Sequence, residues 1–423
     1  MIRRIHVRGY KSLADAQTDL APVSVLFGPN GAGKSNLLDL IGLLSRLASR
    51  ETVREAFEGH RGRPLEAFHS PRGFSREAYE SVVKGSKRLA FQVTVDIEIH
   101  PRIVRDINES LQRREQAVGA TVTYTKVTET RLRYSLEIAM HPSSGELFVS
   151  DESLLALRKD FQPRAETSRL PFFERERDRF VARVERQSHP RYFDLDRPRT
   201  LLSELTDAVY HPHVVAAARE VTSWRVYYVE PSRMRAEVPV QGADDPGRAG
   251  ELLAAYYYSL QQKHPSTLRS LVKNLQGIVA GLQDLRVDVR EGLLELTTIQ
   301  AAGAEFPARL LSEGTLRLLC VLGLAVAPNP PATIVYEEPE NGVNPARLDL
   351  VTDIIRHAAE IRDGGSQFII TTHSPLVCSA LHSHLVRCDW TESGGTRFRA
   401  FPWKPDTLYF ETEVIRALDR PDA

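Results

Sequence analysis

Hydrophobic positions in the first fifty residues follow the order strand, loop, helix. Ile2–Val7 and Val23–Phe27 are short apolar runs of strand length, and the second leads directly into a glycine-rich loop. After that loop, leucine and isoleucine recur every three or four residues over 37–47, which predicts an amphipathic helix that starts at Ser35. A strand that enters a helix through a glycine-rich loop is the local arrangement that phosphate-binding sites use.

The hydrophobic period changes to two in the middle of the chain. Phe91–Ile99 and Leu132–Met140 alternate apolar and polar positions, which predicts two half-buried antiparallel strands. Between them, Ile103–Gln116 predicts a charged amphipathic helix, and the arginine- and glutamate-rich residues 150–220 are expected to be mostly helical. Heptad spacing is not sustained over several turns, so a long coiled coil is not expected.

The last third returns to apolar runs that alternate with a helical pattern. Ala332–Tyr336 and Phe368–Thr371 predict buried strands, and the spacing from Leu348 to Ala358 predicts a helix between them. Such alternation favours an α/β fold, with a parallel sheet covered on both faces. We therefore expect residues 1–50 and 246–423 to form one core, interrupted at about 51–245 by an inserted β-rich and helical lobe.

Composition and charge narrow the class of protein. Hydrophobic residues make up 42% and charged residues 26% of the 423 residues, as in folded globular proteins. The longest apolar stretch, Leu318–Ala327, is too short to cross a bilayer, and no signal peptide is recognised, so we expect a cytoplasmic protein without membrane contact. Basic and acidic residues balance at 55 each. Nucleic acid stays open as a partner, but its contact would have to come from a local basic patch.

The loop at residues 28–35, Gly-Pro-Asn-Gly-Ala-Gly-Lys-Ser, matches the phosphate-loop pattern G-x-x-x-x-G-K-[ST] in full. Backbone N–H groups of such a loop surround phosphate oxygens, and the start of the following helix adds positive partial charge. Lys34 is expected to reach the β- and γ-phosphates of ATP, and the Ser35 hydroxyl to ligate Mg²⁺. The predicted nucleotide-binding residues are Asn30, Gly31, Ala32, Gly33, Lys34, Ser35 and Asn36.

Two adjacent carboxylates, Glu337 and Glu338, end the strand that starts near residue 332. Ligands of parallel α/β sheets bind at the carboxyl ends of the strands. We expect Glu337 to hold the magnesium ion and Glu338 to polarise the attacking water. His373 ends the next strand, where a histidine can hydrogen-bond a γ-phosphate and sense its loss, so Glu338 and His373 are the predicted catalytic residues.

A further nucleotide-facing segment is Leu-Ser-Glu-Gly-Thr at residues 311–315, which opens an apolar helix. Ser312 is a plausible N-cap, and N–H groups at such a helix start can face an anion. Ser312 and Gly314 are therefore candidates for contact with a nucleotide.

Three other groups of residues are interpreted as structural. Cys378, His382, His384 and Cys388 superficially resemble zinc ligands, but packing between a strand and a helix explains them better. The mixed charges of residues 174–186 are typical of a solvated helix face, and Tyr256–Tyr258 are expected to pack a helix rather than to stack on bases.

Taken in chain order, these motifs resemble those of ABC-type ATPases of the overcoming-lysogenisation-defect, RecF and SMC superfamily. The matching segments are the phosphate loop 28–35, the signature-like 311–315, the acidic strand 333–338, the segment 340–345 and His373, with 9–12 similar to the first strand and turn beside the adenine. Two departures are the signature, Leu-Ser-Glu-Gly-Thr in place of Leu-Ser-Gly-Gly-Gln, and Glu337 in place of aspartate. Gln92 is a candidate for the glutamine of the family's Q-loop.

The resemblance implies a P-loop ATPase head that uses ATP and Mg²⁺. It also implies a head-to-tail homodimer in which Ser312 completes the site of the partner. We further expect an ATP-dependent sensor or scaffold of a prokaryotic anti-phage defence system, with a separately encoded nuclease or toxin as effector, because the residues after 345 show no Toprim-like acidic triad. A RecF-like DNA-repair ATPase and a nucleotide-gated scaffold with little turnover remain alternatives.

Overall fold

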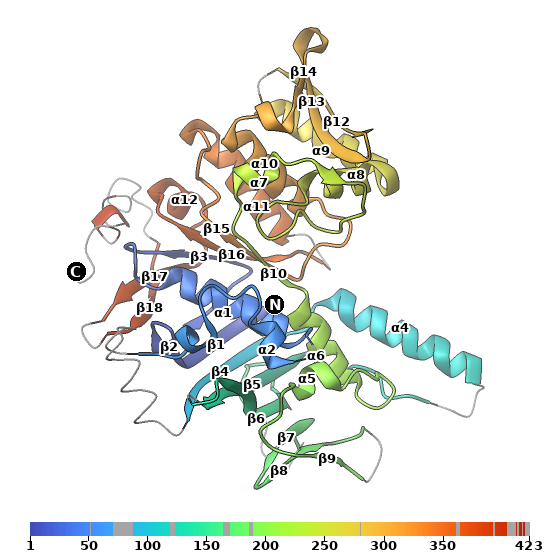
Figure 1. Cartoon of the computed structure of the whole chain (residues 1–423), viewed down its shortest axis with the longest axis vertical. Helices are drawn as coiled ribbons and strands as arrows, with labels where there is room; N and C mark the ends of the chain where they lie inside the picture. Colours follow the sequence, from blue (N-terminus) through green and yellow to red (C-terminus); the bar gives the residue numbers. More distant parts are fainter. Residues whose placement is uncertain are drawn as a thin grey trace.

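A computed structural model describes the chain except residues 51, 71–87, 119–122, 142, 164–169, 186–188, 280, 361–363, 392–393, 404–411, 413, 417 and 419–423. The described residues contain an eight-stranded, a six-stranded and a four-stranded sheet. Figure 1 shows the six-stranded sheet across the middle, the eight-stranded sheet below it, and a group of helices with the four-stranded sheet above. The predicted mixed α/β class is therefore confirmed.

The central sheet has the strand order β10-β15-β16-β3-β17-β18, in which all neighbours are parallel except β17 and β18. Every residue of β3 is buried, as expected for a strand covered on both faces. Leu26 belongs to the core below the sheet, whereas Val25 and Phe27 belong to the core above it. The strand bounds are β3 Val23–Phe27, β10 Trp224–Tyr227, β15 Thr333–Glu337, β16 Gln367–Thr372, β17 Leu385–Trp390 and β18 Thr396–Phe401.

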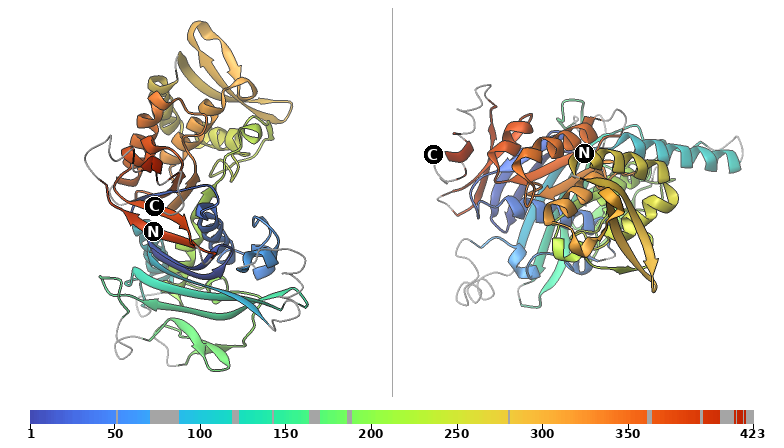
Figure 2. Two further views of the ribbon diagram at one scale, coloured as in Figure 1. Left: turned by 90° about the vertical axis from the view of Figure 1, so that its left-hand side faces the viewer. Right: turned by 90° about the horizontal axis from the view of Figure 1, so that it is seen from above.

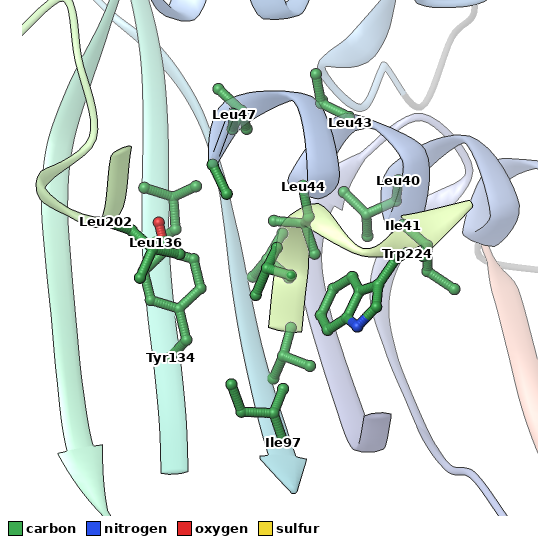
Figure 3. Close-up of a cluster of buried hydrophobic side chains, with 14 of the residues drawn as sticks. Leu40, Ile41, Leu43, Leu44, Leu47, Ile97, Tyr134, Leu136, Leu202 and Trp224 are labelled. Carbon is green, nitrogen blue, oxygen red and sulfur yellow. The ribbon is translucent and has the colours of Figure 1, made fainter. Parts of the chain in front are cut away.

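Helices cover both faces of this sheet. Below it, α1 packs leucine and isoleucine side chains toward Trp224 of β10 and toward the lower sheet, as Figure 3 shows. Above it lie α10, α11 and the tyrosine-containing α8, where Tyr256 and Tyr257 are buried as predicted. The helix bounds are α1 Lys34–Leu47, α2 Val53–Ala56, α4 Pro101–Val118, α5 Leu201–Glu204, α6 Pro212–Thr222, α7 Pro231–Met234, α8 Leu253–Lys263, α9 Pro265–Ile278, α10 Glu313–Ala325, α11 Leu348–Glu360 and α12 Pro375–Ala380.

The lower sheet is antiparallel throughout, in the order β2-β1-β4-β5-β6-β7-β8-β9. The two alternating runs of the sequence are its neighbours β4 and β5, with Val95 opposite Tyr134, and the predicted charged helix is α4. Figure 2 shows the sheet curving beneath α1. The strand bounds are β1 Ile2–Tyr10, β2 Leu13–Asp19, β4 Leu89–Glu98, β5 Arg131–His141, β6 Glu146–Ala156, β7 Phe173–Glu176, β8 Arg179–Ala182 and β9 Arg191–Phe193.

The prediction that residues 150–220 are mostly helical is wrong. The described part of this segment holds the end of β6, the hairpin β7–β8 and β9, with α5 and α6 only near its end. Phe173 of β7 and Phe180 of β8 are fully buried, and Arg177 adopts φ 55° in the turn between the two strands. The residues of β7 that follow Phe173 are charged and only partly buried or exposed, so the high arginine and glutamate content concealed two short strands. Arg186 of the mixed-charge run lies outside the described residues.

The four-stranded sheet lies at the opposite end of the molecule from β7–β9 (Figure 2). Its strands are β11 Val238–Pro239, β12 Leu282–Arg290, β13 Leu293–Gln300 and β14 Glu305–Pro307. Two strand pairs join the predicted core to the predicted inserted lobe at 51–245. β10 of the lobe pairs with β15 of the core, and β4 of the lobe pairs with β1 of the core. Among the described helices α4 is the longest, with 18 residues, and none is long and apolar enough to span a membrane.

Candidate functional site

The phosphate-loop motif connects the end of β3 to the start of α1. Gly28, Gly31 and Gly33 have φ values of 149°, 81° and 95°. A Cβ on Gly28 would lie 2.1 Å from the carbonyl oxygen of Cys388 on β17, and one on Gly33 would lie 1.9 Å from Thr396 Oγ1. These two glycines are therefore required both by backbone conformation and by the close approach of neighbouring strands.

Lys34 is the first residue of α1, and its side chain is folded back onto the loop. Its Nζ donates hydrogen bonds to the carbonyl oxygens of Gly28, at 2.7 Å, and Pro29, at 3.0 Å. Burial lowers the pKa of the Lys34 ammonium, and the carboxylates of Glu337 and Glu338 act in the opposite direction. An anion in the loop would offer this buried charge a stronger partner than two neutral carbonyl groups.

Ser35 and Glu337 meet across the gap between α1 and β15. The Ser35 hydroxyl donates to Glu337 Oε1 at 2.5 Å, and Glu337 Oε2 lies 3.6 Å from Arg61 Nη2. A hydroxyl and a carboxylate are hard oxygen donors of the kind that Mg²⁺ prefers when water and phosphate complete its shell. The residues present therefore fit a magnesium ion. The side chain of Glu337 is longer than that of the aspartate it replaces, and it still reaches Ser35.

Glu338 has φ 49°, in the left-handed region, and this conformation directs its side chain toward the end of β16. Its N–H donates to the carbonyl of Thr371 at 3.0 Å. Its Oε2 accepts from Asn341 Nδ2 at 2.5 Å, and its Oε1 lies 3.4 Å from His373 Nε2. The structure thus brings together the two residues predicted to be catalytic.

His373 is positioned by Glu340, which the sequence marks only as the first residue of the segment 340–345. Glu340 Oε1 accepts from the His373 N–H at 3.0 Å and from Thr372 Oγ1 at 2.6 Å. Burial raises the pKa of Glu340. Burial, followed by the charge of Lys34, lowers the pKa of His373, so its imidazole is neutral near pH 7.

These groups surround one cavity of about 180 Å³. The loop and α1 form one side, and the carboxyl ends of β15 and β16 form the other. Of the predicted residues, Ala32 does not line the cavity because it is buried in the lower core. Asn36 donates from Nδ2 to Ser12 Oγ at 2.6 Å. The lining residues are Asn30, Gly31, Gly33, Lys34, Ser35, Asn36, Glu337, Glu338, Thr371 and His373.

Ser312 and Gly314 do not line this cavity. Ser312 is the N-cap of α10, as predicted, and its Oγ accepts from the N–H of Thr315 at 3.2 Å. Gly314 is buried against the segment after β15, and a Cβ there would lie 2.1 Å from the carbonyl oxygen of Gly342. The signature-like segment therefore lies at the start of a helix, but it does not contribute to the cavity that the phosphate loop of its own chain lines.

Asp39, on α1 behind the loop, is the centre of a charged cluster that the sequence did not reveal. Its carboxylate is 1% exposed at the side chain and accepts from Lys11 Nζ at 2.8 Å and from the Tyr228 hydroxyl at 2.9 Å. Arg61 lies 3.9 Å from the same carboxylate and over the Tyr228 ring. Since Arg61 also approaches Glu337, it links Asp39 to the cavity. Of the residues of this cluster, only Lys11 lies in a motif that the sequence marks, the turn at 9–12.

Two other candidates of the sequence analysis lie elsewhere. Gln92 is in the middle of β4, opposite Glu137 of β5 and Arg8 of β1, and so lies outside the cavity. The segment that follows β10, the neighbour of β15, begins at Tyr228 and contributes that residue to the Asp39 cluster. Among the described residues, no group of three or more histidine, cysteine, aspartate or glutamate side chains could hold a metal ion, so the 378–388 set is not assembled into one.

The chain matches a protein family described as "AAA domain, putative AbiEii toxin, Type IV TA system" over residues 23–183 and 254–379. No curated protein matches it. It is similar to the structure of an Smc head bound to the C-winged helix domain of ScpA, with 12% identity and a TM-score of 0.54 over 95% of this chain and 98% of that one. It is also similar to an Smc head with an extended coiled coil from Pyrococcus furiosus, bound to the C-terminal domain of ScpA, with 12% identity, a TM-score of 0.52 and 99% of each chain covered. At such identity the likeness shows the fold.

Proposed function

This chain belongs to that AAA-domain family and is an ABC-type, SMC-like P-loop ATPase; on this premise we propose that it binds Mg²⁺–ATP and hydrolyses it in the cavity described above. The observation that carries the proposal is the convergence of Lys34, Ser35 and the acidic pair Glu337–Glu338 on one cavity. A phosphate loop facing two carboxylates and a histidine suits the transfer of a phosphoryl group to water.

Each residue has a distinct part in the proposed reaction. Lys34 leaves the loop carbonyls and neutralises phosphate oxygens, while Ser35 and Glu337 hold Mg²⁺, which supplies further neutralisation of phosphate charge. Glu338 accepts the proton of the attacking water. His373, neutral because burial lowers its pKa, donates a hydrogen bond to the γ-phosphate.

We propose that two copies pair head to tail, so that Ser312 of each contacts the nucleotide of the other. The separation of Ser312 from its own cavity supports this arrangement. Apolar side chains flanking both halves of the composite site also support it. Leu310, just before the signature-like segment, is 66% exposed, and Leu376, just after His373, is 44% exposed. Apolar groups left in water at such positions favour burial against a second protein surface.

The hydrolysis proposal is tested with Glu338→Gln and Lys34→Ala. Glu338→Gln keeps the shape of the side chain but removes the proton acceptor, so we expect retained ATP binding and at least a hundredfold loss of turnover. Lys34→Ala is expected to weaken ATP binding itself. Glu360→Gln, an exposed change at the end of α11, is the matched control and should behave as the unmodified protein. Unchanged turnover by Glu338→Gln would contradict the assigned base.

For the biological role, we propose an ATP-dependent sensor or scaffold of a prokaryotic anti-phage system that acts on a separately encoded nuclease or toxin. The family description, which names a toxin of a toxin–antitoxin system, supports a defence setting. The balanced net charge argues against strong binding to duplex DNA as the main activity.

The test of this role uses Glu338→Gln with ATP, titrated with duplex DNA over a salt series beside affinity purification from the native host. We expect weak duplex binding at physiological salt and a stably co-purifying effector. Tight binding of DNA without regard to sequence, and without a partner protein, would instead favour a RecF-like repair ATPase. ATP-dependent pairing of the unmodified protein without turnover would favour a nucleotide-gated scaffold.

A further inference from the structure

A second cavity, distinct from the nucleotide site, lies along the edge strand β10. It has a volume of about 560 Å³ and is bounded by the second half of α1, by β10 and by the segment around Arg248. Four arginines line it: Arg46, Arg50, Arg225 and Arg248. This volume lies in the range of small-molecule sites, which is roughly 300–1,000 Å³.

Three of these guanidinium groups are anchored by neutral backbone carbonyls. Arg46 Nε donates to the carbonyl of Ala56 at 2.7 Å, Arg225 Nη1 to that of Thr222 at 2.6 Å, and Arg248 Nη1 to that of Gly59 at 2.7 Å. A carbonyl fixes the orientation of a guanidinium without cancelling its charge. The arginines are therefore held in place and keep their positive charge for another partner.

Carboxylates compensate this charge only in part. Asp245 lies 3.2 Å from Arg225, and Asp39 lies 3.7 Å from Arg248 but is already bonded to Lys11. Among the described residues, no ion pair joins Arg46 or Arg50 to a carboxylate. Burial lowers the pKa of Arg46, and the nearby charge of Arg248 lowers it further, as expected where like charges meet.

Gly42, in the middle of α1, also lines the cavity. Glycine inside a helix is unfavourable by roughly 0.5–1 kcal/mol relative to alanine, so its presence calls for a packing reason. A Cβ at this position would lie 3.3 Å from Val226 Cγ2 and 3.4 Å from Arg46 Nη1. The glycine thus leaves room for the close approach of Val226 on β10. Figure 3 shows Leu40, Ile41 and Leu44 of the same helix clustered around Trp224 in the core.

We propose that this arginine cavity is a second ligand site, which binds a phosphorylated small molecule of mononucleotide size. Planar guanidinium groups bind phosphate oxygens through paired hydrogen bonds, and four of them around one hollow suit a ligand with more than one phosphate charge. The arginine cavity is concave, which favours a small ligand. A nucleic-acid backbone is long and would fit a shallow groove better.

The cavity is also joined to the nucleotide site by a chain of charged contacts. Arg248 approaches Asp39, Asp39 approaches Arg61, and Arg61 approaches Glu337, whose carboxylate accepts from Ser35. A phosphate that draws Arg248 from Asp39 changes the charge balance around Arg61. Occupancy of the arginine cavity is therefore expected to change the affinity of the nucleotide site, a consequence that rests on the proposed function.

The test measures binding of radiolabelled inorganic pyrophosphate by equilibrium dialysis. Arg50→Gln and Arg225→Gln alter exposed side chains that line the cavity, and Arg54→Gln, an exposed arginine of α2 outside it, is the matched control. Lys34→Ala distinguishes binding at the phosphate loop. We expect Lys34→Ala and Arg54→Gln to retain a binding site that Arg50→Gln and Arg225→Gln weaken at least tenfold, with unchanged thermal unfolding.

Three results would overturn the proposal: pyrophosphate binding that Lys34→Ala abolishes, binding that both cavity variants leave intact, or duplex DNA binding that depends on the same arginines while pyrophosphate does not bind. A loss of ATP turnover in Glu338→Gln bears only on the nucleotide site, so failure of the two proposals is distinguishable.

Discussion

Replacement of Gly28 by alanine provides a sharp test of how the phosphate loop is held, because Gly31 offers a matched control in the same loop. Both glycines have positive φ, at 149° and 81°. A Cβ on Gly28 would lie 2.1 Å from the carbonyl oxygen of Cys388, whereas one on Gly31 has nothing within 4 Å. Both variants therefore place alanine at positive φ, but only Gly28→Ala adds a steric overlap.

The magnitudes follow from these two terms. Alanine in a left-handed or rarer conformation costs about 1–3 kcal/mol at either position. At Gly28, the overlap must be relieved by moving β17, which is paired with β3 through Arg387 and Phe27. Overpacking of this kind costs a further 1–3 kcal/mol or so. We expect Gly28→Ala to lower the free energy of unfolding by about 2–6 kcal/mol, and Gly31→Ala by about 1–3 kcal/mol.

The assay is thermal and urea unfolding of both variants without nucleotide, followed by circular dichroism, so that ligand contacts do not contribute. ATP binding is then measured at a temperature where both variants are folded. Equal unfolding midpoints for Gly28→Ala and Gly31→Ala would refute the view that the approach of β17 dictates glycine at position 28.

Two further predictions concern the dimer and pH. Mixing Lys34→Ala with Ser312→Arg protomers should restore one intact site per heterodimer. We expect each variant alone to be inactive and the mixture to recover ATP turnover. If heterodimers are verified and no turnover is recovered, the shared site is contradicted. His60 is buried beside the Tyr10 hydroxyl, and burial, followed by the charge of Lys11, lowers its pKa to about 4. In the unfolded chain, the pKa of a histidine is about 6.5. The stability that neutral His60 contributes is therefore present above a pH of about 6.5. As the pH falls from about 6.5 toward 4, the unfolded chain binds a proton that folded His60 does not, so the free energy of unfolding decreases by on the order of 2–3 kcal/mol. His60→Gln should flatten that part of the pH–stability curve, and an unchanged curve would exclude His60 as its source.

The sequence predicts well those parts of the site that are encoded by neighbouring residues. The phosphate loop occupies eight consecutive positions and begins where β3 ends. Glu337 ends β15 and Glu338 follows it, so both carboxylates lie at the same edge of the parallel sheet as the loop. The geometry of such an edge is general to α/β folds, so the meeting of Ser35 with Glu337 requires no knowledge of the rest of the chain.

Features that depend on distant contacts could not be predicted in this way. Asp39 lies among apolar residues in the middle of α1, between Leu38 and Leu40, and only the folded chain brings Lys11, Arg61 and Tyr228 to it. Glu340 was recognised only as part of a motif, because its role depends on the N–H of His373. The β7–β8 hairpin was mistaken for helix because its outward charges dominate its composition while only a few large side chains mark the buried face.

The backbone at Glu338 has a consequence for engineering. Its φ of 49° suits glycine or asparagine better than glutamate, so a glutamate at this position lowers the stability of the fold. Redesign guided by stability alone would therefore favour replacing this residue early. The chain would gain thermal tolerance and lose the group to which we assign hydrolysis, as expected where activity and stability place opposite demands on one position.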